Sequence, residues 1–272
     1  MISITPKEFQ ELSGYIKEMY GIHLKEEKTA LLIGRLAHGM QQKGFRSFKE
    51  YFEFVVSDRS GAAASELANK ISTNHTFFMR EAEHFHFFRD RVLPDLADRA
   101  RDKDIRIWCA GCSSGQESYT LAMILEDYFA GSPGWDKKLL ATDLSTKVLE
   151  QAVRGEYEAE LAAALPQQWR TRYMARGPAG TLTVSEKIKS EVVYRKFNLM
   201  EPRFPFRRKF HTIFCRNVMI YFDNPTKEML IRKFWDHTEP GGYLFVSQSE
   251  SFNRETMPYK YVLPGVYRKD VR

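Results

Sequence analysis

Apolar residues recur at helical spacing through the first 72 residues of the chain. One apolar face contains Phe9, Leu12, Ile16, Met19 and Tyr20, and a second contains Leu32, Ile33, Leu36 and Met40. Ser47, three residues before Glu50, is typical of a capped helix start, and a fourth helical pattern covers residues 65–71. The pattern therefore predicts an all-helical N-terminal domain over residues 1–72, followed by a linker segment over residues 73–90.

From residue 105 onward, short apolar runs alternate with helical patterns. The runs cover residues 105–109, 139–143, 210–215 and 242–247, and the helical patterns cover 119–129, 146–153 and 227–237. This alternation is typical of a parallel α/β sheet, which we expect to occupy residues 91–272. Between the helical pattern at 146–153 and the apolar run at 210–215 lie short helices and β-rich pieces, including 181–185 and 191–197. These pieces predict a small antiparallel β-subdomain inserted at about residues 155–197. The last apolar stretch, residues 259–269, predicts a closing hairpin.

Composition describes an ordinary globular protein and narrows its surroundings. The 272 residues are 43% hydrophobic and 28% charged, and no apolar run approaches the length of a membrane span. The amphipathic N-terminus carries Glu8 and Glu11, unlike a signal peptide, and three cysteines give no disulfide framework. We therefore expect a cytoplasmic protein without membrane insertion. A net charge of +6 and a pI near 9.1 indicate an acidic partner, which could be nucleic acid, anionic lipid or an acidic protein surface.

Residues 107–125, IWCAGCSSGQESYTLAMIL, are compatible with three different chemistries. Cys109 and Cys112 resemble a redox pair, but such a pair needs a small thioredoxin-like domain, and Cys109 is expected inside a buried strand. The sequence from Gly111 to Gly115 also matches the G-x-S-x-G turn of serine hydrolases. That chemistry needs an acid and then a histidine, and only His211 and His237 follow, one beginning a strand and one ending a helix.

The third interpretation is a turn that binds an adenosine cofactor between a strand and a helix. It requires a carboxylate at the end of the next strand to accept hydrogen bonds from ribose hydroxyls, and Asp143 ends the run Leu139–Asp143. The dinucleotide fingerprint G-x-G-x-x-G is absent, and no glycine-rich phosphate loop with a lysine is present. This combination favours S-adenosylmethionine, and no metal site is expected. In this turn, Ser114 is predicted to cap the following helix.

Several motifs resemble those of the chemotaxis receptor glutamate methyltransferases, the CheR family. They occur in the expected order over almost the whole chain: NHTFFMRE at 74–81, SGQESY at 114–119, ATD at 141–143, FNL at 197–199 and FCRNVMIYF at 214–222. Met79 departs from the pattern, because an aromatic residue is usual there. The resemblance implies a Rossmann-like S-adenosylmethionine-dependent methyltransferase domain, preceded by a helical domain, that methylates chemoreceptor glutamates for sensory adaptation.

The resemblance also implies roles for individual residues. Asn74, Thr76 and Arg80 would contact the methionine end and sulfonium of the cofactor. Glu117 would bind its amino group, Asp143 its ribose, and Asn198 and Leu199 its adenine. Arg216, Asn217 and Tyr221 would close the site. Arg80 and Tyr221 are the candidate catalytic residues, since an arginine fork and a tyrosine hydroxyl can orient a carboxylate.

A basic cluster in the helical domain is the candidate partner surface. It comprises Lys25, Lys28, Arg35, His38, Lys43 and Arg46. By resemblance, Arg35, Lys43 and Arg46 in particular would dock the acidic helices of a chemoreceptor bundle, with the enzyme a monomer. A short loop at residues 176–180 argues against binding of a receptor tether peptide. A nucleic-acid methyltransferase and a non-catalytic cofactor-binding protein are the alternatives. Against the first, this sequence has no D/N-P-P-Y/F motif, because FCRNVMIYF occupies the place where that motif would stand.

Overall fold

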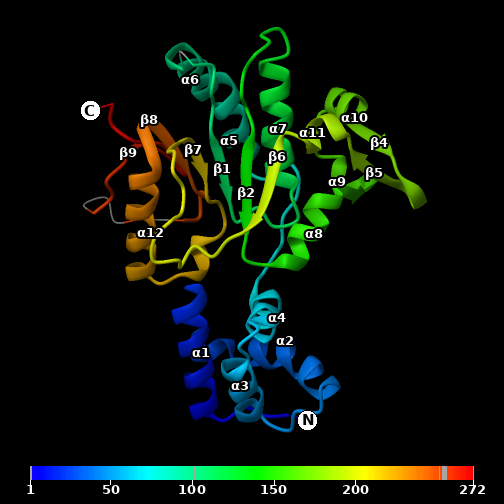
Figure 1. Ribbon diagram of the computed structural model, residues 1–272, viewed down its shortest axis with the longest axis vertical. Coiled ribbons are helices and arrows are strands. Elements are labelled where there is room, and N and C mark those ends of the chain that lie inside the picture. Colours follow the sequence, from blue (N-terminus) through cyan, green and yellow to red (C-terminus); the bar gives the residue numbers. More distant parts are fainter. Residues whose placement is uncertain (1, 101, 251, 253–255, 272) are drawn as a thin grey trace.

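The computed structural model describes residues 2–100, 102–250, 252 and 256–271. A helical domain lies below a larger α/β domain in Figure 1, and one extended segment after residue 71 joins them. Within the described residues, no helix combines the length and apolar content of a membrane span.

The helical domain contains α1 (Pro6–Tyr20), a short 3₁₀ turn η1 (Glu26–Lys28), α2 (Thr29–Gln42), α3 (Phe48–Ser57) and α4 (Ala62–Ile71). Thr5 and Glu8 form a capping box at the start of α1, and Gly21 ends that helix with φ of 74°. At α3, the Ser47 hydroxyl accepts the Glu50 N–H as expected. The predicted apolar faces form one core, except that Met19 is 40% exposed and lies outside it.

The α/β domain is built on a seven-stranded sheet with the order β6-β2-β1-β7-β8-β10-β9. The strands are β1 (Ile107–Ala110), β2 (Leu139–Asp143), β6 (Val192–Lys196), β7 (Phe210–Phe214), β8 (Thr238–Phe245), β9 (Lys260–Leu263) and β10 (Val266–Arg268). The first five in sheet order are parallel, whereas β10 and β9 form the predicted antiparallel hairpin. The parallel α/β fold expected from the sequence is thus confirmed.

Helices cover both faces of this sheet. One core contains Cys109 and Phe214 with side chains from α5 (Ala82–Phe87), the π-helical turn η2 (Phe88–Val92), α6 (Leu93–Arg99) and α7 (Gln116–Tyr128). The opposite core contains Trp108 and Ile213 with side chains from α12 (Asn224–His237). Helix α8 (Thr146–Arg154) follows β2 and contacts β6. Because neighbouring strand residues point to opposite faces, the central strands β1 and β7 contribute to both cores.

The insertion after α8 forms a separate small sheet, at the right in Figure 1. Its strands are β3 (Glu156–Glu158), β5 (Thr181–Val184) and β4 (Met174–Arg176), accompanied by α9 (Ala159–Ala162), α10 (Gln167–Tyr173), the 3₁₀ turn η3 (Pro178–Gly180) and α11 (Glu186–Lys189). The predicted boundary at residue 197 is wrong. Residues 192–196 are β6, which pairs with β2 at the edge of the main sheet, so the insertion ends before Val192.

Candidate functional site

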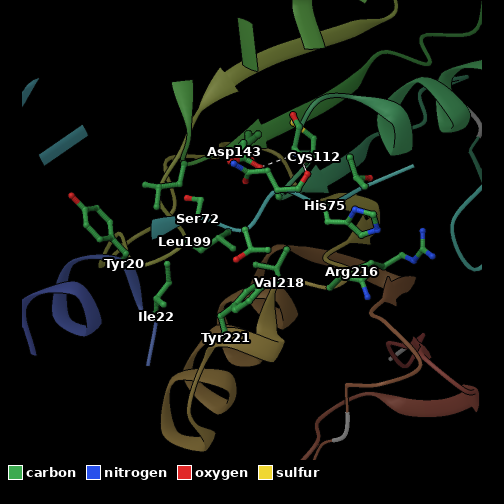
Figure 2. A pocket seen from close by; sticks show the side chains of 18 of the residues that line it. Tyr20, Ile22, Ser72, His75, Cys112, Asp143, Leu199, Arg216, Val218 and Tyr221 are labelled. Carbon is green, nitrogen blue, oxygen red and sulfur yellow. Dashed lines mark hydrogen bonds between the residues drawn. The ribbon is translucent and has the colours of Figure 1, made fainter. Parts of the chain in front are cut away.

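A cavity opens at the carboxyl ends of β1 and β2, between the sheet and the helical domain (Figure 2). It encloses about 980 Å³, part of it open to solvent. Every site residue expected from the sequence contributes to its lining: Asn74, Thr76, Arg80, Glu117, Asp143, Asn198, Leu199, Arg216, Asn217 and Tyr221. Residues distributed over nearly 150 positions of the chain therefore converge on one cavity, at the sheet edge where parallel α/β proteins bind ligands.

The turn after β1 forms the floor of the cavity and brings backbone close to it. The N–H groups of Gly111 and Cys112 donate to the Thr142 carbonyl at 2.8 and 2.9 Å. Gly111 has φ of 89°, and a Cβ there would lie 2.4 Å from Val218 Cγ2, so only glycine fits. The predicted Ser114 cap is wrong: Gly115 is the N-cap of α7, and the Ser114 hydroxyl donates to Gln116 instead.

Asp143 fixes the two turns at the cavity floor. Its carboxylate oxygens accept the N–H groups of Ser113 at 2.8 Å and Ser145 at 2.9 Å. Burial raises the pKa of Asp143, and these backbone hydrogen bonds partly offset that rise. Each carboxylate oxygen has two lone pairs, so the carboxylate keeps acceptor capacity for a ligand hydroxyl.

Glu117 and Arg216 form a buried ion pair at another wall. Arg216 Nη1 lies 2.7 Å from Glu117 Oε2, and the Arg216 side chain is only 1% exposed. Arg216 Nη2 also donates to the Arg80 carbonyl, and the guanidinium lies over the Phe85 ring at 5.0 Å. Arg216 thus lines the cavity while its charge is paired with protein carboxylates.

Arg80 is in a different situation. Its Nη1 donates to the His75 carbonyl at 2.8 Å, and its guanidinium lies 5.7 Å from the Phe77 ring. Among the described residues, no carboxylate forms a salt bridge with Arg80. Met79 and Glu81, on either side of it, have φ of 59° and 53°, a left-handed conformation that costs energy for residues with a side chain.

Two predicted residues are fixed partly by contacts with the helical domain. The Asn198 amide donates to the Met19 carbonyl at 2.7 Å and accepts the Met200 N–H at 3.0 Å, so its side chain stabilises a turn as well as lining the cavity. Tyr221 lies in the 3₁₀ turn η4 (Met219–Tyr221), and its carbonyl accepts the His23 N–H at 2.8 Å.

The helical domain itself supplies part of the wall, which the sequence analysis missed. Tyr20 and Ile22 line the cavity at the left of Figure 2, facing the side that carries Arg216. Ile22 forms an antiparallel bridge with Phe222, and Lys17 forms a salt bridge of 2.7 Å with Asp223. The local sequence signal for this contact was Gly21, a glycine that ends a helix. A Cβ at that position would lie 2.6 Å from Met200 Sδ, so glycine allows the helix end to approach Met200 closely.

The basic cluster of the helical domain is less uniform than expected. Arg35 is half-buried and donates to the Ile71 carbonyl and to the Thr73 hydroxyl, the latter at 2.6 Å, and both partners line the cavity. Lys43 pairs with Glu66, whereas Arg46 is exposed. Arg35 therefore supports the cavity wall and is not simply a surface charge.

Neither competing interpretation of the turn fits this geometry. Cys109 and Cys112 are buried, and burial raises the pKa of both thiols, which disfavours the reactive thiolate. The Ser113 hydroxyl donates to the Asn74 carbonyl at 2.9 Å. His211 lies near the start of β7, where its ring accepts the Arg106 N–H at 3.0 Å. Ser113 follows the opposite, carboxyl end of β1, so His211 cannot serve as a hydrolase base for it.

Comparison with known proteins identifies the family. One family model, described as the CheR methyltransferase all-alpha domain, matches residues 7–72, and another, the CheR methyltransferase SAM binding domain, matches residues 74–264. A chemotaxis protein methyltransferase of Borreliella burgdorferi is 39% identical over 99% of this chain and 96% of its own length. One of Escherichia coli is 34% identical over 93% of this chain and 87% of its own length.

Among solved structures, a glycopeptide N-methyltransferase complexed with S-adenosyl-L-methionine aligns over 58% of this chain and 53% of its own, with 16% identity and a TM-score of 0.32. The two family models together span both domains of the fold, and the relatives match almost from end to end. The chain belongs to the CheR family of chemotaxis protein methyltransferases, and its cofactor is S-adenosylmethionine.

Proposed function

We propose that the protein methylates glutamate side chains on the cytoplasmic helical bundle of chemoreceptors, giving glutamate methyl esters. The observation that carries this proposal is Arg80, which lines the cofactor cavity and has no carboxylate partner among the described residues. Arg216, by contrast, is already paired with a carboxylate. A guanidinium without such a partner beside a methyl donor is suited to orient an incoming carboxylate.

The cavity has the donor set that the cofactor needs. Asp143 supplies a carboxylate with remaining acceptor capacity for the ribose, and Glu117 supplies a carboxylate for the ammonium group. Phe197, Leu199 and Val218 provide apolar surface for the adenine. Asn74, Thr76 and Asn217 lie on the remaining walls, where the methionine end is proposed to bind.

The proposed reaction depends on positioning. Bound S-adenosylmethionine supplies an electrophilic methyl group on its sulfonium. A glutamate with a pKa of about 4.3 is already ionised at neutral pH, so no residue has to remove a proton from the nucleophile. Arg80 would hold one oxygen of the glutamate carboxylate, and the Tyr221 hydroxyl would orient the glutamate side chain toward the methyl group. Contacts that stabilised the carboxylate too strongly would slow its attack.

The helical domain is the proposed docking surface for the acidic receptor helices. Lys25, Lys28, His38, Lys43 and Arg46 are all exposed on or beside α2. Such charges mainly set association rate and salt dependence. A nucleic-acid substrate remains the alternative that the basic composition suggests, and the two differ in what becomes labelled.

The test is to incubate the protein with methyl-labelled S-adenosylmethionine and either a receptor cytoplasmic domain or RNA. We expect base-labile label on the receptor and none on RNA. Arg80→Met should lower kcat on the receptor by about a hundredfold, because an oriented, charge-assisted contact is lost. The exposed Arg91→Met is the matched control and should behave like the wild type. Labelling of RNA without labelling of receptor would overturn the proposal.

A further inference from the structure

Glu81 is a half-buried acceptor that the proposed function does not use. It lies behind the cavity wall and does not line it. Its carboxylate accepts the Ser247 hydroxyl at 2.8 Å, the Gln248 N–H at 3.2 Å and the Asn217 amide at 3.3 Å. Arg216 Nη2 lies 3.5 Å from the same carboxylate. Glu81 therefore connects the linker to the ends of β7 and β8.

The backbone around Glu81 is kept in an unfavourable conformation. Its φ of 53° is left-handed, as is the φ of 59° at Met79. For residues with a side chain, each such conformation costs about 1 kcal/mol and persists only where surrounding contacts impose it. The contacts of Glu81 supply that constraint, and they fix Arg80 between the two strained residues.

Arg216 is shared between two carboxylates. Its Nη1 contacts Glu117 at 2.7 Å, and its Nη2 contacts Glu81 at 3.5 Å. Burial raises the pKa of Glu81, but Arg216 and the hydrogen-bond donors around the carboxylate have the larger, opposite effect. The pKa of Glu81 therefore lies below its ordinary value, and Glu81 is ionised at neutral pH. Burial lowers the pKa of the neighbouring His84, which is neutral there. Two carboxylates and one guanidinium give the three-residue cluster a formal net charge of one negative unit.

We propose that Glu81 is a positioning residue for cofactor binding: by sharing the charge of Arg216, it leaves Glu117 a net negative charge for the cofactor's ammonium group. Without the Glu81 charge, Arg216 would neutralise Glu117, and the cavity would lose its attraction for a cation. The inference rests on the proposed contact between Glu117 and that ammonium.

The test compares two probes that differ only in the amino-acid tail. S-adenosylhomocysteine carries the ammonium group, and 5′-methylthioadenosine keeps the adenosine and thioether without it. In Glu81→Gln, the dissociation constant of S-adenosylhomocysteine, measured by calorimetry, should rise about tenfold, the order of effect expected for the loss of one nearby unit charge at an effective dielectric constant of about 20. Binding of 5′-methylthioadenosine should not change. In turnover, KM for the cofactor should rise and kcat should change little.

Two matched variants separate the effect of losing the Glu81 charge from the effect of disturbing the fold. Glu83→Gln removes an exposed carboxylate two residues away and should leave the binding of both probes unchanged. Glu81→Asp retains the charge and should keep the preference for S-adenosylhomocysteine, even if its thermal stability falls. Equal weakening of both probes in Glu81→Gln, or no change in either, would overturn the inference.

The variant Glu117→Gln distinguishes failure of the inference about Glu81 from failure of the proposed contact between Glu117 and the ammonium group. If Glu117→Gln abolishes the preference for S-adenosylhomocysteine and Glu81→Gln does not, Glu117 binds the ammonium and the inference about Glu81 is wrong. If neither substitution changes the preference, the assignment of Glu117 is wrong as well.

Discussion

Glu250 gives a stability prediction with a defined pH dependence. Its buried carboxylate accepts the Ser247 N–H at 2.6 Å and the Ile220 N–H at 3.1 Å, so it fastens the loop that carries Val218 and Tyr221 into the cavity. Burial raises the pKa of Glu250 from 4.5 to about 7, against the opposing effect of these hydrogen bonds.

The sign and size of the effect follow from proton linkage. The native state binds the Glu250 proton more tightly than the unfolded chain does. The resulting stabilisation is therefore complete below about pH 4.5 and is lost as the pH rises through about 7. Between about pH 5 and 8, that loss amounts to about 2 kcal/mol of unfolding free energy.

Glu250→Gln removes this titration and keeps most of the side-chain shape. We would measure urea unfolding of wild type and variant at pH 5 and pH 8. The stability of the wild type relative to the variant should fall by about 2 kcal/mol across that range. Glu11→Gln, at an exposed position of α1, is the control and should show no such change. A difference between wild type and Glu250→Gln that is the same at both pH values would refute the reasoning.

Three further predictions concern the cavity and its surroundings. Asp143→Ala should weaken S-adenosylhomocysteine binding by about 1.5–3 kcal/mol in calorimetry, through the loss of hydrogen bonds to a charged acceptor; unchanged affinity in a folded variant would exclude Asp143 from the site. The double variant Cys109→Ala and Cys112→Ala should transfer methyl groups equally in reducing and oxidising buffer, and activity that followed the thiol state would contradict this. Arg46→Glu should impair receptor methylation, most at low salt, without changing cofactor affinity, whereas Arg35→Glu should also weaken cofactor binding because Arg35 supports the cavity wall. Equal cofactor affinity in the two charge reversals would contradict that distinction.

The sequence predicted the elements whose signal is local. Asp143 was found because an apolar run ends in a carboxylate, and the turn before α7 because small residues separate a strand from a helix. The strand Val192–Lys196 was assigned to the wrong sheet, since nothing in five residues shows that the chain has returned to the main sheet after an insertion. Tyr20 and Ile22 were missed for a related reason: their place in the cavity depends on packing between a helix end and a loop about 200 residues later.

The pairing of Ile22 with Phe222 bears on how this enzyme can be divided. The two family models meet between residues 72 and 74, and Ser72, Thr73 and Asn74 all line the cavity. A fragment cut at that junction would keep the whole sheet, yet its cofactor pocket would open to water on the side where Tyr20 and Ile22 had been. Exchanging helical domains between relatives would therefore also alter cofactor affinity, unless residues 17–23 were transplanted to match the loop at 198–223.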